Sequence, residues 1–393
     1  MEAPQAGRPV STPQAGRPVE APQADRPVDA PQAAPLARPG GAPPHDAGGT
    51  GREDAGVLRG LRARRRRRLL VSGAAIAAAV VIAFVVTLSV GARPVAPLDV
   101  LAALTGSASP GTELVVLRLR LPRALTALLV GTALGLAGAL FQRLLRNRLA
   151  SPDIIGISAG ASAAAVAGTV LLGLSATGVS VAAVLGALAT TALILALTHR
   201  DGLHGVRFVL VGVGIGSGLL AVVSFLMIRA SLTSAQENLV WLTGSVNQAD
   251  WSRTVPLTVA CAALVPAALV LARALPRLEL GDDTATALGL PVGRVRLALI
   301  AVGVLLVAAA VAAAGPVSFV ALVCGPLATR AAGPGRGSLP HAAGIGALLV
   351  LASDLVARYL VADVALPVGV VTGAIGAPYL LLLLARARTR GTT

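Results

Sequence analysis

The sequence contains no lysine, only two cysteines, and few aromatic or charged residues, which make up 2% and 13% of its 393 residues. Without lysine, the chain cannot form the Gly-x-x-x-x-Gly-Lys-Ser/Thr phosphate-binding loop, so any ATP chemistry belongs to another polypeptide. Cys261 and Cys324 lie far apart in apolar runs, which favours buried side chains over a disulfide or metal site. The four histidines do not cluster with acids or cysteines. We therefore expect no catalytic residues, no resident metal and no cofactor.

Apolar residues are abundant instead. They make up 55% of the chain, and the mean hydropathy is +0.79, as in a membrane protein that crosses the bilayer many times. Arginine carries the whole net charge of +15. Because the arginines gather at the ends of apolar runs and in one N-terminal block, they indicate membrane topology and contact with lipid, and no nucleic-acid binding is expected.

Residues 1–66 differ in composition from the rest. A Pro-Gln-Ala-Gly-Arg-Pro-Val motif begins at Pro4 and recurs with a spacing of nine residues before it decays near Pro31. Such a composition cannot bury a core, so we predict a disordered cytoplasmic tail. Six arginines between Arg62 and Arg68 precede the first apolar run, and the positive-inside rule places the N-terminus in the cytoplasm. The C-terminus is expected on the same side.

Residues 67–390 are predicted to form one all-α domain of about ten transmembrane helices, because the apolar runs have membrane-spanning length. An external connection is expected over 92–119, with a short helix at 97–104. Another external loop is expected over 237–251. The predicted spans are 69–91, 124–141, 154–174, 179–197, 207–227, 254–275, 295–314, 319–332, 342–360 and 366–385.

The most informative stretch is 118–165. Its apolar run holds Gly131, Gly135 and Gly138 at the spacing that lets neighbouring helices approach closely. A basic cluster of Arg143, Arg146 and Arg148 follows, and a turn at 151–153 leads into a second Gly-rich apolar segment. The pattern predicts a closely packed helical hairpin.

This stretch combines Arg-Leu-Pro-Arg at 120–123 with the pieces at 131–142, 147–152 and 156–161. In this order and spacing the pieces resemble the FecCD permeases, the membrane subunits of bacterial ABC importers for ferric siderophores, haem and cobalamin. Later pieces at 241–247, 314–321, 352–358 and 366–378 are also similar to the family. The resemblance implies an inverted internal repeat. It also implies three kinds of partner: ABC ATPase subunits, a second permease copy or paralogue, and an extracytoplasmic substrate-binding protein.

Two positions depart from the family's pattern. The usual Asn-Pro-Leu-Ala reads Asn-Arg-Leu-Ala, with Arg148 in place of proline, and Gly325-Pro326 stands where many members have Pro-His or Pro-Gln. Altered gating, an atypical substrate and a subunit that no longer transports remain alternatives.

The polar stretch 278–292 has an acidic start that suits a helix N-terminus, and Gly289 and Pro291 are expected to end the helix. Ala285, Leu288 and Leu290 are expected to share one face. From the residues alone, an amphipathic loop on the membrane explains the pattern equally well. The resemblance implies a coupling helix that docks in a groove of the ATPase. The implied coupling residues are Asp282, Asp283, Ala285, Leu288, Gly289, Leu290 and Pro291.

Asp354 is a carboxylate within a predicted span, and Arg358 lies one helical turn further on. This spacing predicts an i,i+4 ion pair; a proton relay is the alternative. By the resemblance, Arg120, Arg123 and Arg358 face outward and pair with acidic residues of the binding protein. Contact with phospholipid head groups is the alternative for these arginines.

The resemblance also places the pore between two permease subunits, lined by the fifth and tenth spans. The implied residues of this path are Gly212, Gly214, Gly216, Gly218 and Thr372. The Trp241–Asn247 string favours a ferric siderophore over cobalamin or haem as the substrate. An ion-gradient-driven secondary transporter is the rival from another class. The single intramembrane acid, Asp354, and the coupling stretch argue against that rival.

Overall fold

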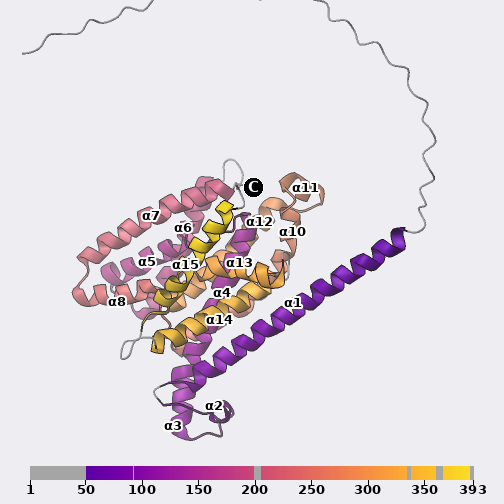
Figure 1. Ribbon diagram of the computed structural model, residues 1–393. Helices are drawn as coiled ribbons and strands as arrows, with labels where there is room; N and C mark the ends of the chain where they lie inside the picture. The colour runs from indigo at the N-terminus through magenta and orange to yellow at the C-terminus, as the bar shows by residue number, and fades with distance from the viewer. Residues whose placement is uncertain (1–49, 92, 199–204, 334–337, 360–365, 390–393) are drawn as a thin grey trace, which may run out of the picture. The chain divides into compact units, whose positions relative to one another are not determined.

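The computed structural model describes residues 50–91, 93–198, 205–333, 338–359 and 366–389, and all regular elements within these ranges are helices (Figure 1). The chain divides into two units, residues 1–57 and 58–393, and the helix bundle belongs to the second. Helix α1 (Thr50–Ser89) begins before the predicted tail boundary at residue 66. The Pro-rich repeat that begins at Pro4 lies outside the described residues.

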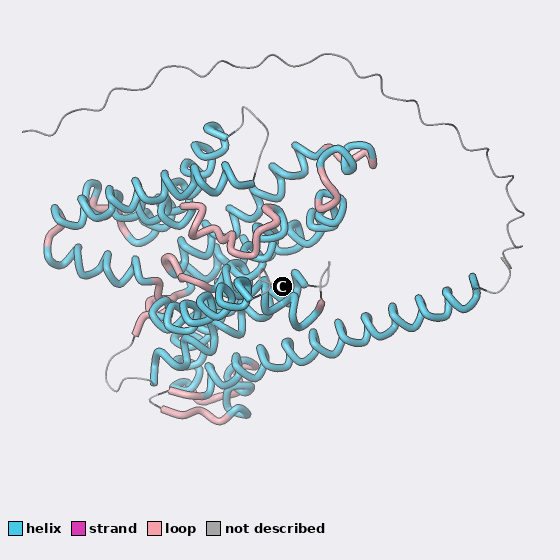
Figure 2. Tube along the Cα trace, turned by 45° about the horizontal axis from the view of Figure 1, so that its top comes forward, coloured by secondary structure: helices cyan, strands magenta, loops and turns pink. Residues whose placement is uncertain are grey.

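Seven described helical segments are long and apolar enough to cross a membrane, and three shorter apolar helices accompany them (Figure 2). This confirms the prediction of an all-α membrane protein with about ten spans. The long segments are 62–89 of α1, 110–144, α6 (Ala176–Thr198), 207–229 of α7 (Gly205–Arg229), 251–278 starting with α9 (Trp251–Leu271), α12 (Val292–Ala314) and α14 (Ser338–Tyr359). The shorter ones are α5 (Ile157–Leu172), α13 (Val320–Ala332) and 368–382 of α15 (Val368–Thr389).

Two predicted connections contain more helix than expected. Helix α2 (Pro97–Leu104) confirms the predicted short helix, but α3 (Pro110–Glu113) and a π-helical segment (Leu114–Arg120) run without a break into α4 (Leu121–Leu144). Proline is tolerated in the first turn of a helix, which explains Pro110, whereas Pro122 lies inside the run, directly after the π-helical segment. In the predicted loop 237–251, α8 (Leu232–Thr243) is capped by Ser231, whose hydroxyl accepts a hydrogen bond from Ser234 N–H at 3.2 Å.

Helix α4 forms the centre of the packing and contacts α9, α12, α13 and α14. A Cβ atom added at Gly131 would lie 2.2 Å from the carbonyl oxygen of Gly346 in α14. The same atom at Gly138 would lie 1.9 Å from the carbonyl oxygen of Ala321 in α13. Backbone therefore touches backbone at the predicted glycine positions, as small residues allow between membrane helices.

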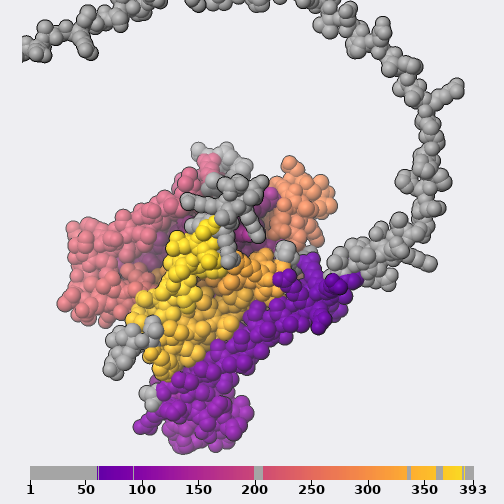
Figure 3. Space-filling model, viewed as in Figure 1, coloured from indigo at the N-terminus to yellow at the C-terminus, as the bar shows by residue number. Residues whose placement is uncertain are grey.

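The part of α1 that belongs to the second unit lies along α14 on the face that Figure 3 shows. Its Ser72 hydroxyl hydrogen-bonds to His341 Nε2 at 2.8 Å. Arg68, from the N-terminal arginine block, donates to the carbonyl oxygens of Arg330 and Ala331 at 2.6 and 3.1 Å, and so caps the end of α13. No residue of the most apolar 18-residue window of α1 is fully buried, although Val80, Ala83 and Phe84 pack partly buried against the core.

Replacing Gly138 with alanine is expected to lower the free energy of unfolding by about 1–3 kcal/mol, because α4 and α13 must move apart to admit the methyl group. The measurement is denaturant unfolding of the purified protein in detergent. Gly214→Ala is the matched control: no atom lies within 4 Å of its added Cβ, so we expect unchanged or slightly higher stability. Equal stability of both variants would contradict the close contact between α4 and α13.

Candidate functional site

Helix α4 carries charged clusters at both of its ends. Arg123 lies in its first turn and Arg143 in its last, which at 1.5 Å per residue separates them by about 30 Å, the thickness of the hydrocarbon core. The two clusters therefore lie near opposite membrane surfaces. We refer to them as the Arg123 end and the Arg143 end.

At the Arg123 end, one buried carboxylate binds two arginines. Asp354 is fully buried; its Oδ1 accepts from Arg123 Nη2 at 2.7 Å, and its Oδ2 pairs with Arg358. The predicted i,i+4 pair is thus confirmed, and Arg123 joins it from α4. Arg123 also donates to the side-chain oxygen of Asn247. With two guanidinium groups against one carboxylate, the cluster keeps an excess positive charge, and the arginine side chains remain 18% and 14% exposed.

Arg120, predicted with them as a docking residue, is buried elsewhere. Its guanidinium donates to the carbonyl oxygens of Leu88 and Ser89, at 2.7 and 2.9 Å, and to that of Arg93. These are the last carbonyls of α1 and the residues after it, where a cation stabilises a helix C-terminus. Its contacts are therefore those of a structural cap.

Three of the sequence pieces that resemble the family meet beside this cluster. Gly244 and Gly315 both have positive φ, of 73° and 71°, and a Cβ on Gly315 would lie 2.2 Å from the carbonyl oxygen of Trp241. Ser245 N–H donates to Ala314 O at 2.7 Å, and Gly369 N–H donates to Gly244 O at 3.0 Å. The Trp241–Asn247 string therefore packs against the starts of two later motifs, and this packing places Asn247 beside Arg123.

The Arg143 end holds the predicted coupling stretch 278–292, which begins at the last residue of α10 (Leu275–Leu278) and contains α11 (Asp282–Ala287). Arg143 forms a 2.8 Å ion pair with Glu279, and Arg146 donates to the carbonyl oxygen of Leu278. Asp282 pairs with Arg296 of α12 at 2.8 Å. The stretch is thus fixed to both α4 and α12, and a displacement of the stretch would pull on these two helices.

The predicted shared face of the coupling stretch is wrong for one residue. Ala285 is fully buried and Leu290 nearly so, whereas Leu288 is 56% exposed. The cause is that α11 ends at Ala287 and Gly289 takes a φ of +76°, which turns the chain after the helix. The outward surface includes the predicted coupling residues Asp282, Asp283, Leu288, Gly289 and Pro291, together with Thr284, Thr286 and Ala287.

The two departures from the family's pattern line the same cavity, of about 200 Å³, at the Arg143 end. Arg148, Gly325 and Pro326 are all among its lining residues. A Cβ on Gly325 would lie 1.9 Å from the side-chain oxygen of Gln142, whose amide donates to Leu322 O at 2.9 Å. The two unusual positions therefore alter one place, where α4 meets α13.

The four glycines predicted for the path form two pairs with different surroundings. A Cβ on Gly212 would lie 2.4 Å from Ile155 O, and one on Gly216 would lie 3.0 Å from Gly156 Cα, so both pack against the start of α5. Gly214 and Gly218 have no atom within 4 Å of an added Cβ and face outward. Thr372, from the tenth span, is buried and donates to Gly369 O at 3.1 Å. Within the described ranges, no group of His, Cys, Asp or Glu could hold a metal ion.

Comparisons with known proteins agree with this architecture. The model of the FecCD transport family matches residues 61–386. The ferric enterobactin transport system permease protein FepG of Escherichia coli K12 is 42% identical over 77% of this chain and 92% of its own length. The iron(3+)-hydroxamate import system permease protein FhuG of Bacillus subtilis 168 is 35% identical over 78% of this chain and 94% of its own. A solved inward-facing structure of a metal-chelate type ABC transporter superposes with a TM-score of 0.72 and 28% identity, covering 80% of this chain and 98% of that one. The chain therefore belongs to the FecCD transport family.

Proposed function

We propose that this chain is the permease subunit of an ABC importer that carries a ferric siderophore across the cytoplasmic membrane, powered by a separate ATPase subunit. The observation that carries the proposal is the family match over residues 61–386, together with relatives named for ferric enterobactin, achromobactin and iron(3+)-hydroxamate. Cobalamin and haem remain the alternative substrates within the family.

The Arg143 end faces the cytoplasm in this proposal, together with both chain termini. The exposed part of the stretch 282–291 docks on the ATPase, and the ion pairs of Glu279 and Asp282 pass its movement to α4 and α12. The exposure of Leu288 supports this role, because an apolar side chain next to two acidic residues offers a partner a specific contact.

The Arg123 end faces the extracytoplasmic binding protein in this proposal. Arg123 and Arg358 keep an excess positive charge and partial exposure, which suits acidic residues on a partner. Arg120 contributes indirectly, by fixing the end of α1 next to the π-helical segment.

The path runs between two permease copies or paralogues, along the outward face of α7 in this proposal. Gly214 and Gly218, one helical turn apart, add no side chain at these two positions of that face, which gives room for a large ligand. Gly212, Gly216 and Thr372 would hold the neighbouring segments behind it. A path of this kind binds its ligand weakly, and the binding protein supplies most of the selectivity.

Uptake of labelled ferric siderophores into cells with and without the gene tests the function, with cobalamin and haem measured in parallel. We expect ferric-siderophore uptake to disappear with the gene and to stop when ATP is depleted while the proton gradient is kept. Siderophore uptake that is the same in cells with and without the gene would contradict the proposed substrate. Dependence on the ion gradient alone would overturn the ABC mechanism in favour of a secondary transporter.

A further inference from the structure

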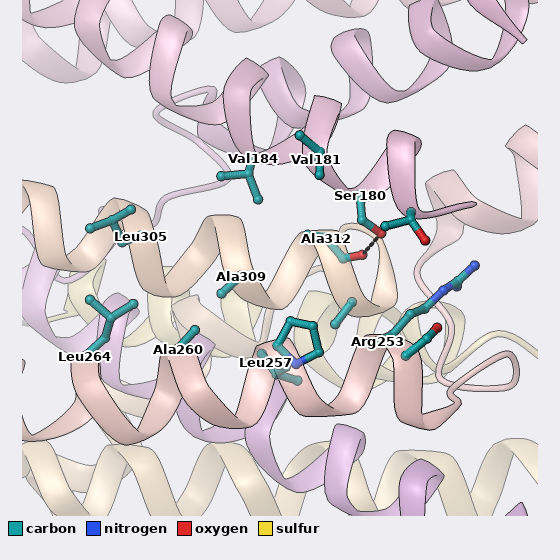
Figure 4. Close-up of a pocket in the computed structure, with 14 residues that line it drawn as sticks. Ser180, Val181, Val184, Arg253, Leu257, Ala260, Leu264, Leu305, Ala309 and Ala312 are labelled. Atoms are coloured by element: carbon teal, nitrogen blue, oxygen red, sulfur yellow. Dashed lines mark hydrogen bonds between the residues drawn. The ribbon is translucent and has the colours of Figure 1, made fainter. Parts of the chain in front are cut away.

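A groove of about 320 Å³ lies between α6, α9 and α12, and its residues belong to none of the clusters described above (Figure 4). Most of its surface is apolar, formed by residues such as Leu257, Leu264 and Leu305. Alanines of α12 also line it, and a 2.8 Å hydrogen bond from the Ser180 hydroxyl to Ala312 O ties α6 to α12. The groove is therefore a built feature of three membrane-spanning helices.

The groove changes in polarity along its length. Figure 4 shows Arg253 at one end and Leu264 and Leu305 at the other. Thr177, Ser180 and Ser252 join Arg253 at the polar end, near the first turns of α6 and α9 and the last turn of α12. From Arg253 to Leu264 is eleven residues along α9, or about 16 Å, close to half of the hydrocarbon core of about 30 Å. The groove thus extends from a membrane surface to the middle of the bilayer.

Arg253 is available for an anionic ligand. Its guanidinium donates no hydrogen bond to any residue in the described part of the chain. The nearby Asp250 is engaged with the start of α9, where its Oδ1 accepts from Ser252 Oγ at 2.8 Å and from Arg253 N–H at 3.1 Å. Slight desolvation raises the pKa of Asp250, but these hydrogen bonds and the Arg253 charge hold it below its usual value. Asp250 is thus a charged helix cap and only partly offsets the charge of Arg253.

The size and surroundings of the groove select its occupant. A transmembrane helix is about 10 Å wide, so a helix of a second copy could lie across the opening of this groove of about 320 Å³ but would not enter it. A flexible hydrocarbon chain can enter it. The neighbouring Val181, Val255 and Val259 are between 51% and 65% exposed, so the rim is apolar and meets lipid.

We propose that this groove binds one acyl chain of an anionic phospholipid, whose phosphate pairs with Arg253. The acyl chain lies against α9 and α12 as far as Leu264 and Leu305, and the head group stays at the membrane surface. Pro256 also lines the groove, and because proline has no N–H, the carbonyl of Ser252 loses its usual helical partner at the polar end. That carbonyl can accept a hydrogen bond from a head-group hydroxyl.

The test is native mass spectrometry of the purified full-length protein, titrated with phosphatidylglycerol or phosphatidylcholine after delipidation. We expect the wild type to retain phosphatidylglycerol preferentially. Arg253→Gln is expected to weaken its retention about five-fold, the contribution of one interfacial arginine. Arg253→Lys keeps the charge and is expected to retain most binding. Ala309→Phe fills the groove and is expected to abolish specific retention of both lipids.

Arg229→Gln is the matched control, since Arg229 ends α7 and stacks over Phe225 at 4.9 Å, outside the groove. Its lipid retention is expected to equal that of the wild type. Thermal unfolding of each variant shows whether it is folded. Equal retention by all folded variants would mean general surface lipid only and would overturn the proposal. If the wild type retained the two lipids equally, and only Ala309→Phe lost them, the proposed preference for an anionic head group would be wrong.

Discussion

Replacing Asp354 with asparagine is expected to lower the free energy of unfolding by about 3–5 kcal/mol, the cost of removing one partner from a buried ion cluster. Asparagine has the same shape, so the loss comes from charge. Arg123 and Arg358 would then lie close together, mostly buried, without the carboxylate that neutralises one of them. Denaturant unfolding in detergent measures the change. Asp282→Asn is the control, because Asp282 is more than half exposed in its pair with Arg296, and such a pair contributes at most about 1 kcal/mol.

A double variant separates charge from packing at this cluster. The double variant combines Asp354→Asn with Arg358→Gln, so the carboxylate and one arginine are removed together. Arg123 is then the single cation and keeps its hydrogen bond to Asn247. We expect the double variant to be more stable than Asp354→Asn alone, so that the two changes are not additive. Additive losses would contradict the electrostatic account of the cluster.

Sequence reasoning worked where the determining spacing is local. The glycines of α4 recur every three or four residues, and this period alone predicts close approach of neighbouring helices, which the structure identifies as α13 and α14. The pair between Asp354 and Arg358 is likewise a matter of one helical turn. The helix start at Asp282 follows from acidic residues at a helix N-terminus.

The partners that sequence reasoning missed are distant in the chain. Arg123 reaches Asp354 across 231 positions, and no local pattern shows which of the arginines near the start of α4 will do so. Arg120, three residues earlier, is the last residue of the π-helical segment, and its side chain reaches the end of α1 instead. Glu279 and Arg296, which anchor the coupling stretch, were missed for the same reason. The one available signal was that Glu279 is a charge within, and Arg296 a charge just after, a stretch already expected to function.

The error at Leu288 has a different cause. A helical face was extended past the residue where the helix ends, although Gly289 at the next position is a common signal for a helix end. The helix boundaries at Pro110 and in α8 were wrong in a related way, because the ends of helices depend on caps and turns and less on apolar periodicity. The exposure of Leu288 makes it more suitable for testing the coupling stretch, since a buried leucine would be needed for folding.

Replacing Leu288 with aspartate is expected to abolish ATP-driven uptake and the co-purification of ATPase subunits, while the protein remains folded. The side chain is 56% exposed, so the charge meets water in the free permease and costs little stability. At a docked interface the same charge would be desolvated, next to Asp282 and Asp283, which is unfavourable by several kcal/mol unless a partner charge compensates. The measurements are labelled uptake, ATPase co-purification and thermal unfolding, made on the same preparations.

Two further variants decide how the result is interpreted. Leu98→Asp makes the same chemical change at an 80% exposed leucine of α2, which packs beside the π-helical segment at the Arg123 end, and we expect it to leave ATPase association intact. Ala285→Asp places the charge at a fully buried position of α11 and is expected to unfold the stretch. Its results therefore show what a loss of structure looks like in the same measurements.

If Leu288→Asp keeps both uptake and ATPase association, residues 282–291 are not the docking surface. Family membership and siderophore transport would still stand, because they rest on the match over residues 61–386 and on the uptake experiment. Loss of association with unchanged thermal unfolding would instead identify Leu288 as part of the contact through which ATP binding moves α4 and α12.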